Sequence, residues 1–405
     1  MIDPAQVKSN FPLLVGQPEL AYLDNAATSQ KPATVLEAMD EFYRTQNGSV
    51  RRGVHQLSES ATAAYEGARQ SVARFIGAES AREVVFTRGT TSAINLVAQT
   101  WARDAVANQR SAIVMTEMEH HANYLPWLAL QKETGCELRV IKMTDSGELD
   151  LDNVEQKLTG AGLLAVTHTS NVLGVANPIQ ELAERAHATG AKILVDAAQA
   201  PAHEAVDVQA LQADFLVFSA HKMYGPTGIG VLWARAKILE GMRPLEYGGQ
   251  MIKSVTAADF EVAESPWKFE AGTMPVAEAV GLAAAIQYLM KLGPADIHRH
   301  DRKLTEYALT QLADADGVTI YGPLDGERRH GLVSFTVDGV HPHDLATILA
   351  DANVAIRSGH HCAAPLHARL GVPATARASW GIYNETADLD RLVQGIKDAR
   401  KTLAR

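Results

Sequence analysis

Short runs of apolar residues alternate with longer, helical patterns between about residues 20 and 235. The apolar runs predict strands that are buried on both faces, and the segments between them predict helices. The predicted strands span residues 83–87, 112–116, 137–143, 163–168, 192–196, 214–219 and 228–233. Helices are predicted between several of them, for example at residues 58–76, 91–102 and 178–189. This order favours an α/β fold with a mostly parallel, seven-stranded sheet that helices cover on both faces.

The pattern changes after about residue 290. A helix at 302–313, strands at 318–321 and 332–337 and a helix at 343–352 come first. Strands at 354–357 and near 377–380 and a final helix at 387–403 follow. These elements predict a smaller α+β unit. We therefore expect a large domain at residues 18–288 and a small domain built from residues 1–17 and 289–405. A cleft between two such domains is a common place for a ligand.

Composition and charge narrow the classes of function. Of the 405 residues, 46% are hydrophobic and 21% are charged, and the formal net charge is −10. Proteins that bind nucleic acid usually carry a basic face, so neither nucleic acid nor an anionic membrane surface is an expected partner. The most apolar late segment, 277–289, contains Glu278 and Gln287 and is too short to span a bilayer. The first residues lack the basic and apolar regions of a signal peptide, and Asp3 followed by proline predicts a helix start.

The chain has two cysteines, Cys136 and Cys362. Two cysteines do not make a disulfide framework, and their scarcity fits a reducing cytoplasm. We therefore expect a cytoplasmic protein. Cys136, in the stretch TGCELRV, is interpreted as a packing residue at a turn.

Lys222 occupies an unusual place for a lysine. It lies in the stretch SAHKMYGPTGIG, directly after the apolar strand predicted to end at residue 219. Ligands of open α/β sheets bind at such strand ends. Asp196 ends another buried strand, where a carboxylate is costly unless a cation or a hydrogen-bond donor meets it. The plain alternatives are a loop lysine that reaches solvent and an aspartate that caps the next helix. Adjacent strand ends would place both side chains on one rim.

An anion site is predicted near the same rim. The stretch RGTTSAIN follows a strand and opens a helix, so Thr90 and Thr91 offer hydroxyl and N–H groups at a helix N-terminus. A plain helix cap is the alternative. Ser219 and His221 lie close to Lys222 in sequence and can add donors to the same anion.

Two further strand ends carry polar side chains. The stretch EMEHHANYLPW places His120 and His121 after one strand, and THTSNVLG places Asn171 after another. No second ligand pair with zinc spacing lies nearby, so we predict no metal site. A histidine ring can instead stack on a flat heterocycle. A lysine amine, a buried acid, an anion cradle and a stacking ring together match the needs of pyridoxal 5′-phosphate (PLP).

Several ordered motifs then point to one family. They are AYLDNAATSQKP (21–32), RGVHQLS (52–58), RGTTSAINLVA (88–98), MEHHAN (118–123), SNVLG (170–174), SAHKMYGPTGIG (219–230), FEAGT (269–273), RSGHHCAAPL (357–366) and RASWGIYN (377–384). With them the chain resembles, over essentially its whole length, the group II cysteine desulfurases of the SufS type, which are related to selenocysteine lyases. The resemblance implies the PLP-dependent aminotransferase fold type I and a homodimer with its sites near the subunit interface.

The resemblance also implies roles for individual residues. Lys222 is the Schiff-base lysine, Asp196 pairs with the pyridine nitrogen, and Gln199 contacts the phenolic oxygen. His120 stacks on the ring and is expected to give or take a proton. The residues implied to hold the phosphate are Thr90, Thr91, Ser219 and His221, with Thr273 reaching the phosphate of the neighbouring subunit. Those implied to bind the substrate carboxylate are Arg377, Asn171 and Arg357, since a guanidinium fork matches a carboxylate.

Cys362 is the predicted nucleophile. It lies in the polar stretch SGHHCAAP, where His360, His361 and Arg357 are close in sequence and favour the thiolate. The resemblance implies that Cys362 takes the sulfur of L-cysteine as a persulfide and that alanine is released. It further implies that a SufE-like or zinc-bearing SufU-like protein accepts the sulfur for iron–sulfur cluster assembly.

Other functions stay open at this point. A selenocysteine lyase uses the same residues, whereas an aminotransferase has no need for a loop cysteine. A binding protein with an inactive site is disfavoured because Lys222, Asp196 and Cys362 are all present. In the stretch GVHPHDLA, His343 is either a solvent-facing loop histidine or a contact to the zinc of a SufU-like partner, and Asp344 is expected to help cap the following helix.

Overall fold

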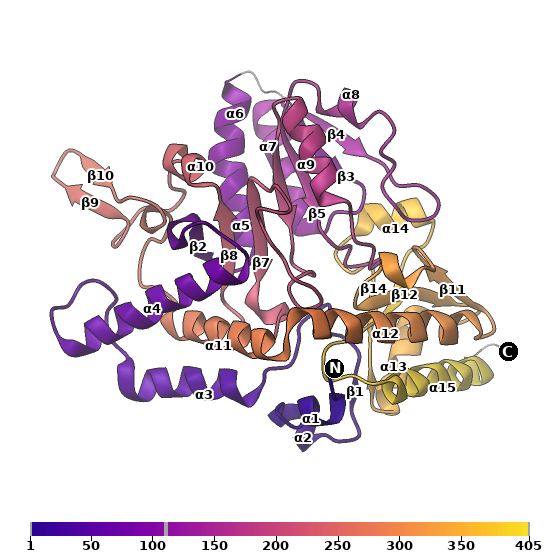
Figure 1. The fold of residues 1–405 in the computed structure, drawn as a ribbon. Coiled ribbons are helices and arrows are strands. Elements are labelled where there is room, and N and C mark those ends of the chain that lie inside the picture. Colours follow the sequence, from indigo (N-terminus) through magenta and orange to yellow (C-terminus); the bar gives the residue numbers. More distant parts are fainter. Residues whose placement is uncertain (1, 109–111, 404–405) are drawn as a thin grey trace.

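The structure, a computed structural model, describes residues 2–108 and 112–403 (Figure 1). Within these residues a seven-stranded sheet forms the centre of the larger part of the molecule, as predicted. Only β8 runs against the other strands of this sheet. In spatial order the strands are β2 (Val84–Thr87), β8 (Gly230–Ala234), β7 (Phe215–Ser219), β6 (Lys192–Asp196), β5 (Ala161–Thr167), β3 (Ala112–Thr116) and β4 (Glu137–Ile141).

Helices cover both faces of this sheet because successive side chains of a strand point to opposite sides. On one face, Leu194 and Phe215 pack with α5, α7 and α10. On the other face, Val195 and Leu216 pack with α4, α8, α9 and α11. Burial on both sides explains the nearly continuous apolar runs that predict the strands. The helices of this part are α3 (Ala33–Glu41), α4 (Gln56–Phe75), α5 (Thr90–Val97), α6 (Arg103–Ala107), α7 (Leu125–Thr134), α8 (Val154–Leu158), α9 (Ile179–Ala188), α10 (Ala236–Gly241) and α11 (Val276–Leu292).

The carboxyl ends of β2, β3, β5, β6 and β7 lie along one edge of the sheet, because all of its strands except β8 run in the same direction. Asp196, at the end of β6, pairs in register with Val217 of β7. The segment that carries Lys222 therefore leaves β7 beside Asp196. The prediction that these two side chains share one rim is confirmed.

A second sheet contains four antiparallel strands. In spatial order they are β11 (Val318–Tyr321), β12 (Leu332–Val337), β15 (Thr375–Ser379) and β14 (Arg357–Gly359). One apolar cluster joins this sheet to α12, α13 and α15, which lie around it in Figure 1. The helices of this part are α12 (Pro294–Ala313), α13 (Pro342–Asp351), α14 (Ala364–Leu370) and α15 (Thr386–Leu403).

One predicted strand, at residues 354–357, is wrong as a single element. Its first half, β13 (Val354–Ala355), pairs in parallel with β1 (Ala21–Tyr22). After Ile356 the chain enters β14, which pairs with β15 of the four-stranded sheet. Each half thus satisfies its backbone groups on a different partner, which the local sequence does not reveal.

The start of the chain contacts both parts of the molecule. The carboxylate of Asp3 accepts a hydrogen bond from the first turn of α1, as predicted for a helix cap. Phe11 packs in a cluster of the large sheet, whereas Ala21 and Leu23 pack in the cluster of the four-stranded sheet. The domain boundaries stay a prediction, and the one at residue 288 falls inside α11. The short helices here are α1 (Pro4–Lys8) and α2 (Pro12–Gly16).

No single helix of the described residues is long and apolar enough to cross a membrane. Only α11 and α12 taken together reach that length and composition, and they are bent by 78° relative to each other. A hairpin of β9 (Ile252–Val255) and β10 (Phe260–Val262) projects from the larger part of the molecule (Figure 1).

A buried cluster of Asp301, His203 and His330 joins the two parts of the molecule beside α12. Asp301 of α12 lies 2.9 Å from Nδ1 of His203 and accepts a hydrogen bond from the N–H of Gly331 at 3.2 Å. Nδ1 of His330 lies 3.5 Å from the same carboxylate. Burial by itself raises the pKa of Asp301, but His203 and His330 outweigh burial and bring the pKa well below its usual value. The ionised carboxylate therefore stabilises the contact between the parts.

We expect Asp301→Asn to remove an acid-sensitive part of the stability. Because the folded-state pKa is lowered, the contribution of Asp301 is complete above its unfolded pKa of about 3.9 and is lost as the pH falls through the folded-state pKa. The wild type is then more stable than the variant near pH 6, and the difference shrinks toward about pH 3. Urea unfolding midpoints across this range are the measurement, and a difference that does not change with pH contradicts the assignment.

Candidate active site

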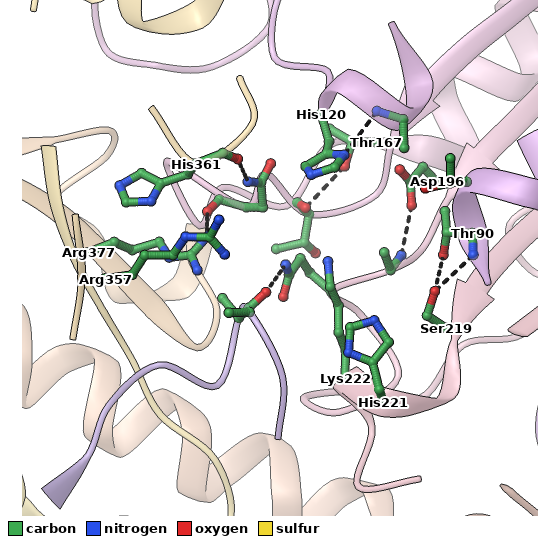
Figure 2. Close-up of a pocket in the computed structure, with 18 residues that line it drawn as sticks. Thr90, His120, Thr167, Asp196, Ser219, His221, Lys222, Arg357, His361 and Arg377 are labelled. Carbon is green, nitrogen blue, oxygen red and sulfur yellow. Dashed lines mark hydrogen bonds between the residues drawn. The ribbon is translucent and has the colours of Figure 1, made fainter. Parts of the chain in front are cut away.

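A cavity of about 220 Å³ lies at the carboxyl edge of the large sheet and reaches the four-stranded sheet (Figure 2). It brings together side chains that follow five strands of the large sheet and two arginines from β14 and β15. Eleven predicted site residues line it: Thr90, Thr91, His120, Asn171, Asp196, Gln199, Ser219, His221, Lys222, Arg357 and Arg377. Two predicted site residues, Thr273 and Cys362, are not among its lining residues.

Lys222 points its amine into this cavity (Figure 2). It ends the short 3₁₀ turn that follows β7. Burial lowers the pKa of Lys222 to about 8; Asp196 opposes this shift, and Arg377 and Arg357 reinforce it. An amine with such a pKa is partly neutral near neutral pH, and a neutral amine can act as nucleophile or base.

Asp196 faces the cavity from the neighbouring strand end. Its side chain is buried, and Oδ1 accepts a hydrogen bond from the N–H of Ala198 at 3.0 Å. Burial raises the pKa of Asp196, whereas this hydrogen bond and Lys222 lower it. Oδ2 accepts from none of the described residues and is available to a protonated ligand nitrogen. Beside it, Nε2 of Gln199 donates to the carbonyl of Ala26 at 3.0 Å.

Hydroxyl and N–H groups gather at one end of the cavity, at the start of α5 (Figure 2). The hydroxyl of Ser219 lies 2.8 Å from both the backbone nitrogen and the hydroxyl of Thr90. A Cβ atom added at Gly230 would lie 2.5 Å from Cα of Gly89, so only glycine allows β8 this close to the turn. The N-terminus of α5 and these donors match the needs of a phosphate group.

The turn that carries His221 and Lys222 is held by the segment after β1. The carbonyl of His221 accepts hydrogen bonds from the N–H and hydroxyl of Ser29, at 3.0 and 3.1 Å, and from the amine of Lys31 at 3.1 Å. Burial lowers the pKa of His221 to about 4, and Lys222 and Lys31 add to the effect. Neutral His221 contacts the hydroxyl of Thr28 through Nδ1 at 3.2 Å.

His120 lies opposite Lys222 in the cavity (Figure 2). Burial lowers its pKa to about 3, with Lys222 as the next largest cause. Its Nδ1 accepts a hydrogen bond from the N–H of Ala122 at 3.0 Å, so the proton of the neutral ring is on Nε2. The ring is thus fixed as a flat, uncharged surface with one N–H group.

Two arginines define the end of the cavity opposite Ser219 (Figure 2). Arg357 and Arg377 pair in register across β14 and β15. Arg377 is buried and donates to the carbonyl of Asn171 at 2.8 Å and to the carboxylate of Asp24 at 3.3 Å. Burial lowers the pKa of Arg377 to about 10. Its Nε has no hydrogen-bond partner among the described residues, which is costly unless a ligand oxygen reaches this end.

Cys362 lies in the turn between β14 and α14, beside the cavity. It is a free, partly exposed cysteine, and its charge would be felt by both Lys222 and Arg377. Asn171 donates to the carbonyl of the preceding residue, His361, at 2.8 Å. Cys136 is buried among apolar residues, as expected for a packing residue.

Thr273 lies outside the cavity of this chain. It lines a separate depression of about 230 Å³ between α4, α5 and the start of α11. Glu270, three residues before Thr273, is buried and forms a bidentate ion pair with Arg69, at 2.6 and 2.9 Å. This pair fixes the loop that presents Thr273. A contact between Thr273 and the phosphate of a neighbouring subunit stays a prediction.

Sequence reasoning missed Glu119, directly before His120. Glu119 is buried and accepts hydrogen bonds from the hydroxyl of Thr116, the N–H of Thr167 and the side chain of Asn123. Burial raises its pKa to about 8, against the effect of these donors. Glu119 is part of the stretch EMEHHAN, but only its burial against β5 distinguishes it from a surface glutamate.

In the stretch GVHPHDLA, the residue that caps the helix differs from the prediction. His341 caps α13 by accepting, through Nδ1, from the N–H of His343 at 3.2 Å, so Asp344 is not the cap. The cap falls on His341 because Pro342 occupies the first helical position. His343 is exposed and contacts the hydroxyl of Ser358 through Nδ1 at 2.8 Å. Within the described residues no group of three or more His, Cys, Asp or Glu is placed to hold a metal ion.

The cavity fits PLP on its own geometry. The α5 end offers donors for a phosphate, and the free oxygen of Asp196 suits a protonated ring nitrogen. The neutral ring of His120 suits a stacked heterocycle, and the amine of Lys222 suits a carbonyl carbon. When bound, PLP supplies the electron sink that makes the substrate α-carbon acidic.

Comparisons with known proteins agree with this geometry. The aminotransferase class-V family model matches residues 21–392. A protein of Halalkalibacterium halodurans named "Probable cysteine desulfurase" is 48% identical over 98% of this chain and 98% of its own. The apo structure of a cysteine desulfurase from Thermococcus onnurineus NA1 matches with a TM-score of 0.95 and 42% identity, and covers 100% of this chain and 99% of its own. The Escherichia coli cysteine desulfurase CsdA matches with a TM-score of 0.90 and 38% identity, with complete coverage of both chains.

These matches extend over both sheets and every segment that lines the cavity. They confirm the predicted fold, that of the PLP-dependent fold type I enzymes. The chain therefore belongs to the PLP-dependent aminotransferase class-V family and, within it, to the cysteine desulfurases.

Proposed function

We propose that the chain takes sulfur from L-cysteine, releases L-alanine and holds the sulfur as a persulfide on Cys362. One observation carries the proposal: a partly exposed free thiol lies within electrostatic reach of both Lys222 and Arg377 at a cavity suited to PLP. The reaction joins the substrate sulfur to the sulfur of Cys362 and breaks its bond to carbon. A proton replaces the sulfur on that carbon, which yields alanine.

In the proposed reaction, residues that line the cavity have separate roles. Arg377 and Asn171 bind the substrate carboxylate, because the fork of a guanidinium matches its two oxygens. Arg357 adds positive charge at the same end of the cavity, which favours binding of this carboxylate. Lys222, with a pKa of about 8, takes the α-proton. His120, neutral with a proton on Nε2, holds or delivers a second proton.

The remaining cofactor contacts belong to the same proposal. Asp196 and Gln199 hold the ring, and a homodimer brings Thr273 of a neighbouring subunit to the phosphate. The proposed phosphate contacts within the chain are Thr90, Thr91, Ser219 and His221.

The destination of the sulfur is the next part of the proposal. We place the chain in group II (SufS type), in the cytoplasm, with a SufE-like or SufU-like protein as acceptor. Partial exposure of Cys362 supports transfer to a second protein, since a persulfide must be reached by the thiol that attacks it. The exposed His343 supports contact with a zinc-bearing acceptor.

Replacement of Cys362 tests the proposed function. We expect Cys362→Ala to lower alanine formation from L-cysteine by at least about 100-fold, because the variant lacks the attacking thiolate. The measurement is alanine and sulfide release in the presence of a reductant. Cys136→Ala is the matched control and retains wild-type turnover, because Cys136 is buried away from the cavity. Full activity of Cys362→Ala, or no alanine from the wild type, contradicts the proposal.

A further inference from the structure

The second histidine of the paired motif, His121, contacts the loop of the nucleophile at Cys362 itself and at Ala364, two residues later. The N–H of His121 donates to the carbonyl of Cys362 at 2.7 Å. Its Nε2 accepts a hydrogen bond from the N–H of Ala364 at 3.1 Å. His121 follows β3 of the large sheet, whereas Cys362 and Ala364 follow β14 of the four-stranded sheet. One residue thus joins the two parts of the molecule at the cysteine.

The loop needs external support because its backbone is unfavourable. His361 and Cys362 have φ angles of 50° and 57°, in the left-handed region that residues other than glycine rarely adopt. Two such residues in succession persist only where surrounding contacts hold them. Within the loop, Nδ1 of His360 accepts from the N–H of Cys362 at 3.1 Å. From outside it, the side chains of Asn171 and His121 contact the loop backbone. The hydroxyl of Thr375 contacts the ring of His361 at 3.0 Å, and the ring of His367 contacts the carbonyl of Ala363 at 3.1 Å.

His121 acts in this arrangement as a neutral imidazole. Nε2 accepts from Ala364, so the ring proton is on Nδ1. The ring of His360 lies 5.5 Å away and is tilted by 42°, so it adds packing on the solvent side. The bonds of His121 involve only the backbone of the loop. No described residue makes a hydrogen bond to the thiol of Cys362, which remains free to react.

We propose that His121 is a positioning residue that docks the Cys362 loop and aims the thiol at the substrate sulfur. The inference rests on the proposed role of Cys362 as nucleophile and adds the residue that holds it in place. A reacting atom displaced by about 1 Å costs on the order of 100-fold in rate even when binding is intact. Loss of the Nε2 acceptor therefore lowers kcat, while KM for L-cysteine changes little because Arg377 and Asn171 keep their places.

Three substitutions separate the acceptor from the bulk of the ring. His121→Leu and His121→Phe remove the acceptor, and His121→Phe keeps the ring. His121→Gln offers a carbonyl oxygen that can accept from Ala364. Lys132→Leu, on the exposed face of α7, is the matched polar-to-apolar control.

The first measurement is amide hydrogen exchange of residues 358–364 in the enzyme without PLP. We expect about tenfold faster exchange in His121→Leu and His121→Phe and near wild-type exchange in His121→Gln and Lys132→Leu. The second is the rate of alanine formation by the PLP-loaded enzyme. We expect kcat to fall by about 10- to 100-fold in the Leu and Phe variants, with KM within about threefold of wild type, and expect His121→Gln to recover most of kcat.

Several results overturn the proposal. If His121→Leu or His121→Phe folds and shows the exchange rate and kcat of the wild type, the proposal is wrong. It is also wrong if His121→Gln loses as much kcat as His121→Phe. If both acceptor-free variants fail to fold, His121→Gln is the deciding variant. Exchange of its loop at the wild-type rate supports docking by His121, and faster exchange contradicts it. A wild type without alanine formation, or an active Cys362→Ala, instead contradicts the proposed function and leaves the exchange result as a separate measurement of docking.

Discussion

Lys222→Ala is expected to abolish alanine formation, with a loss of about 1,000-fold or more in turnover. The amine of Lys222 points into the cavity that Asp196 and His120 also line (Figure 2). Its lowered pKa of about 8 makes it a base near neutral pH, and a methyl group offers no substitute. General-base catalysis contributes about 100- to 10,000-fold, and loss of the proposed covalent link between Lys222 and PLP adds to this cost.

Turnover and the visible absorbance of bound PLP are measured together. Lys237→Ala, an exposed lysine on α10, is the control and is expected to match the wild type in both. If Lys222→Ala retains more than about a tenth of wild-type turnover, Lys222 is not the base, and the site must be assigned again.

Glu270→Ala is expected to produce the largest loss of stability, about 3–5 kcal/mol in the free energy of unfolding. The carboxylate of Glu270 forms the buried pair with Arg69 and accepts hydrogen bonds from the N–H of Phe86 at 2.9 Å and the hydroxyl of Tyr65 at 3.1 Å. Without it, the guanidinium of Arg69 remains buried with one partly exposed acid, Glu66, at 2.9 Å. A buried charge that loses its main partner is far more costly than an absent pair.

Urea unfolding at one protein concentration measures the effect. The matched control is Glu264→Ala, which breaks an exposed pair with Arg82 at 3.1 Å and is expected to leave the unfolding midpoint near that of the wild type. A loss in Glu270→Ala no larger than in the control means that the Arg69 charge is compensated elsewhere. The variant also tests whether the loop of Thr273 depends on this pair, through the affinity of the chain for PLP.

The structure explains why part of the site could be predicted. Asp196 ends one apolar run and Lys222 follows shortly after another, and parallel strands place their carboxyl ends at one edge. The same logic predicts Thr90, His120 and Asn171, because each follows a strand of the same direction. These inferences need only local patterns and one topological rule.

Other features depend on contacts between distant segments. Glu119 has the sequence context of an ordinary acid, and its burial exists only because β5 supplies the N–H of Thr167. Residues 354–357 divide between two sheets because β1 and β15 offer two different partners. The contact of His121 with Ala364 spans 243 positions.

The amino-acid sequence by itself determined the α/β order, the strand ends that carry the cofactor chemistry and the motifs of the family. These features depend on the periodic burial of side chains and on strand direction, so local stretches of the sequence are enough to predict them. Only the tertiary structure decided that Glu119, next to His120, is buried, where Thr273 lies and what holds Cys362 in its left-handed turn. Those outcomes follow from long-range packing and from the need of each buried polar group for a partner, and neither is visible along a single stretch of chain.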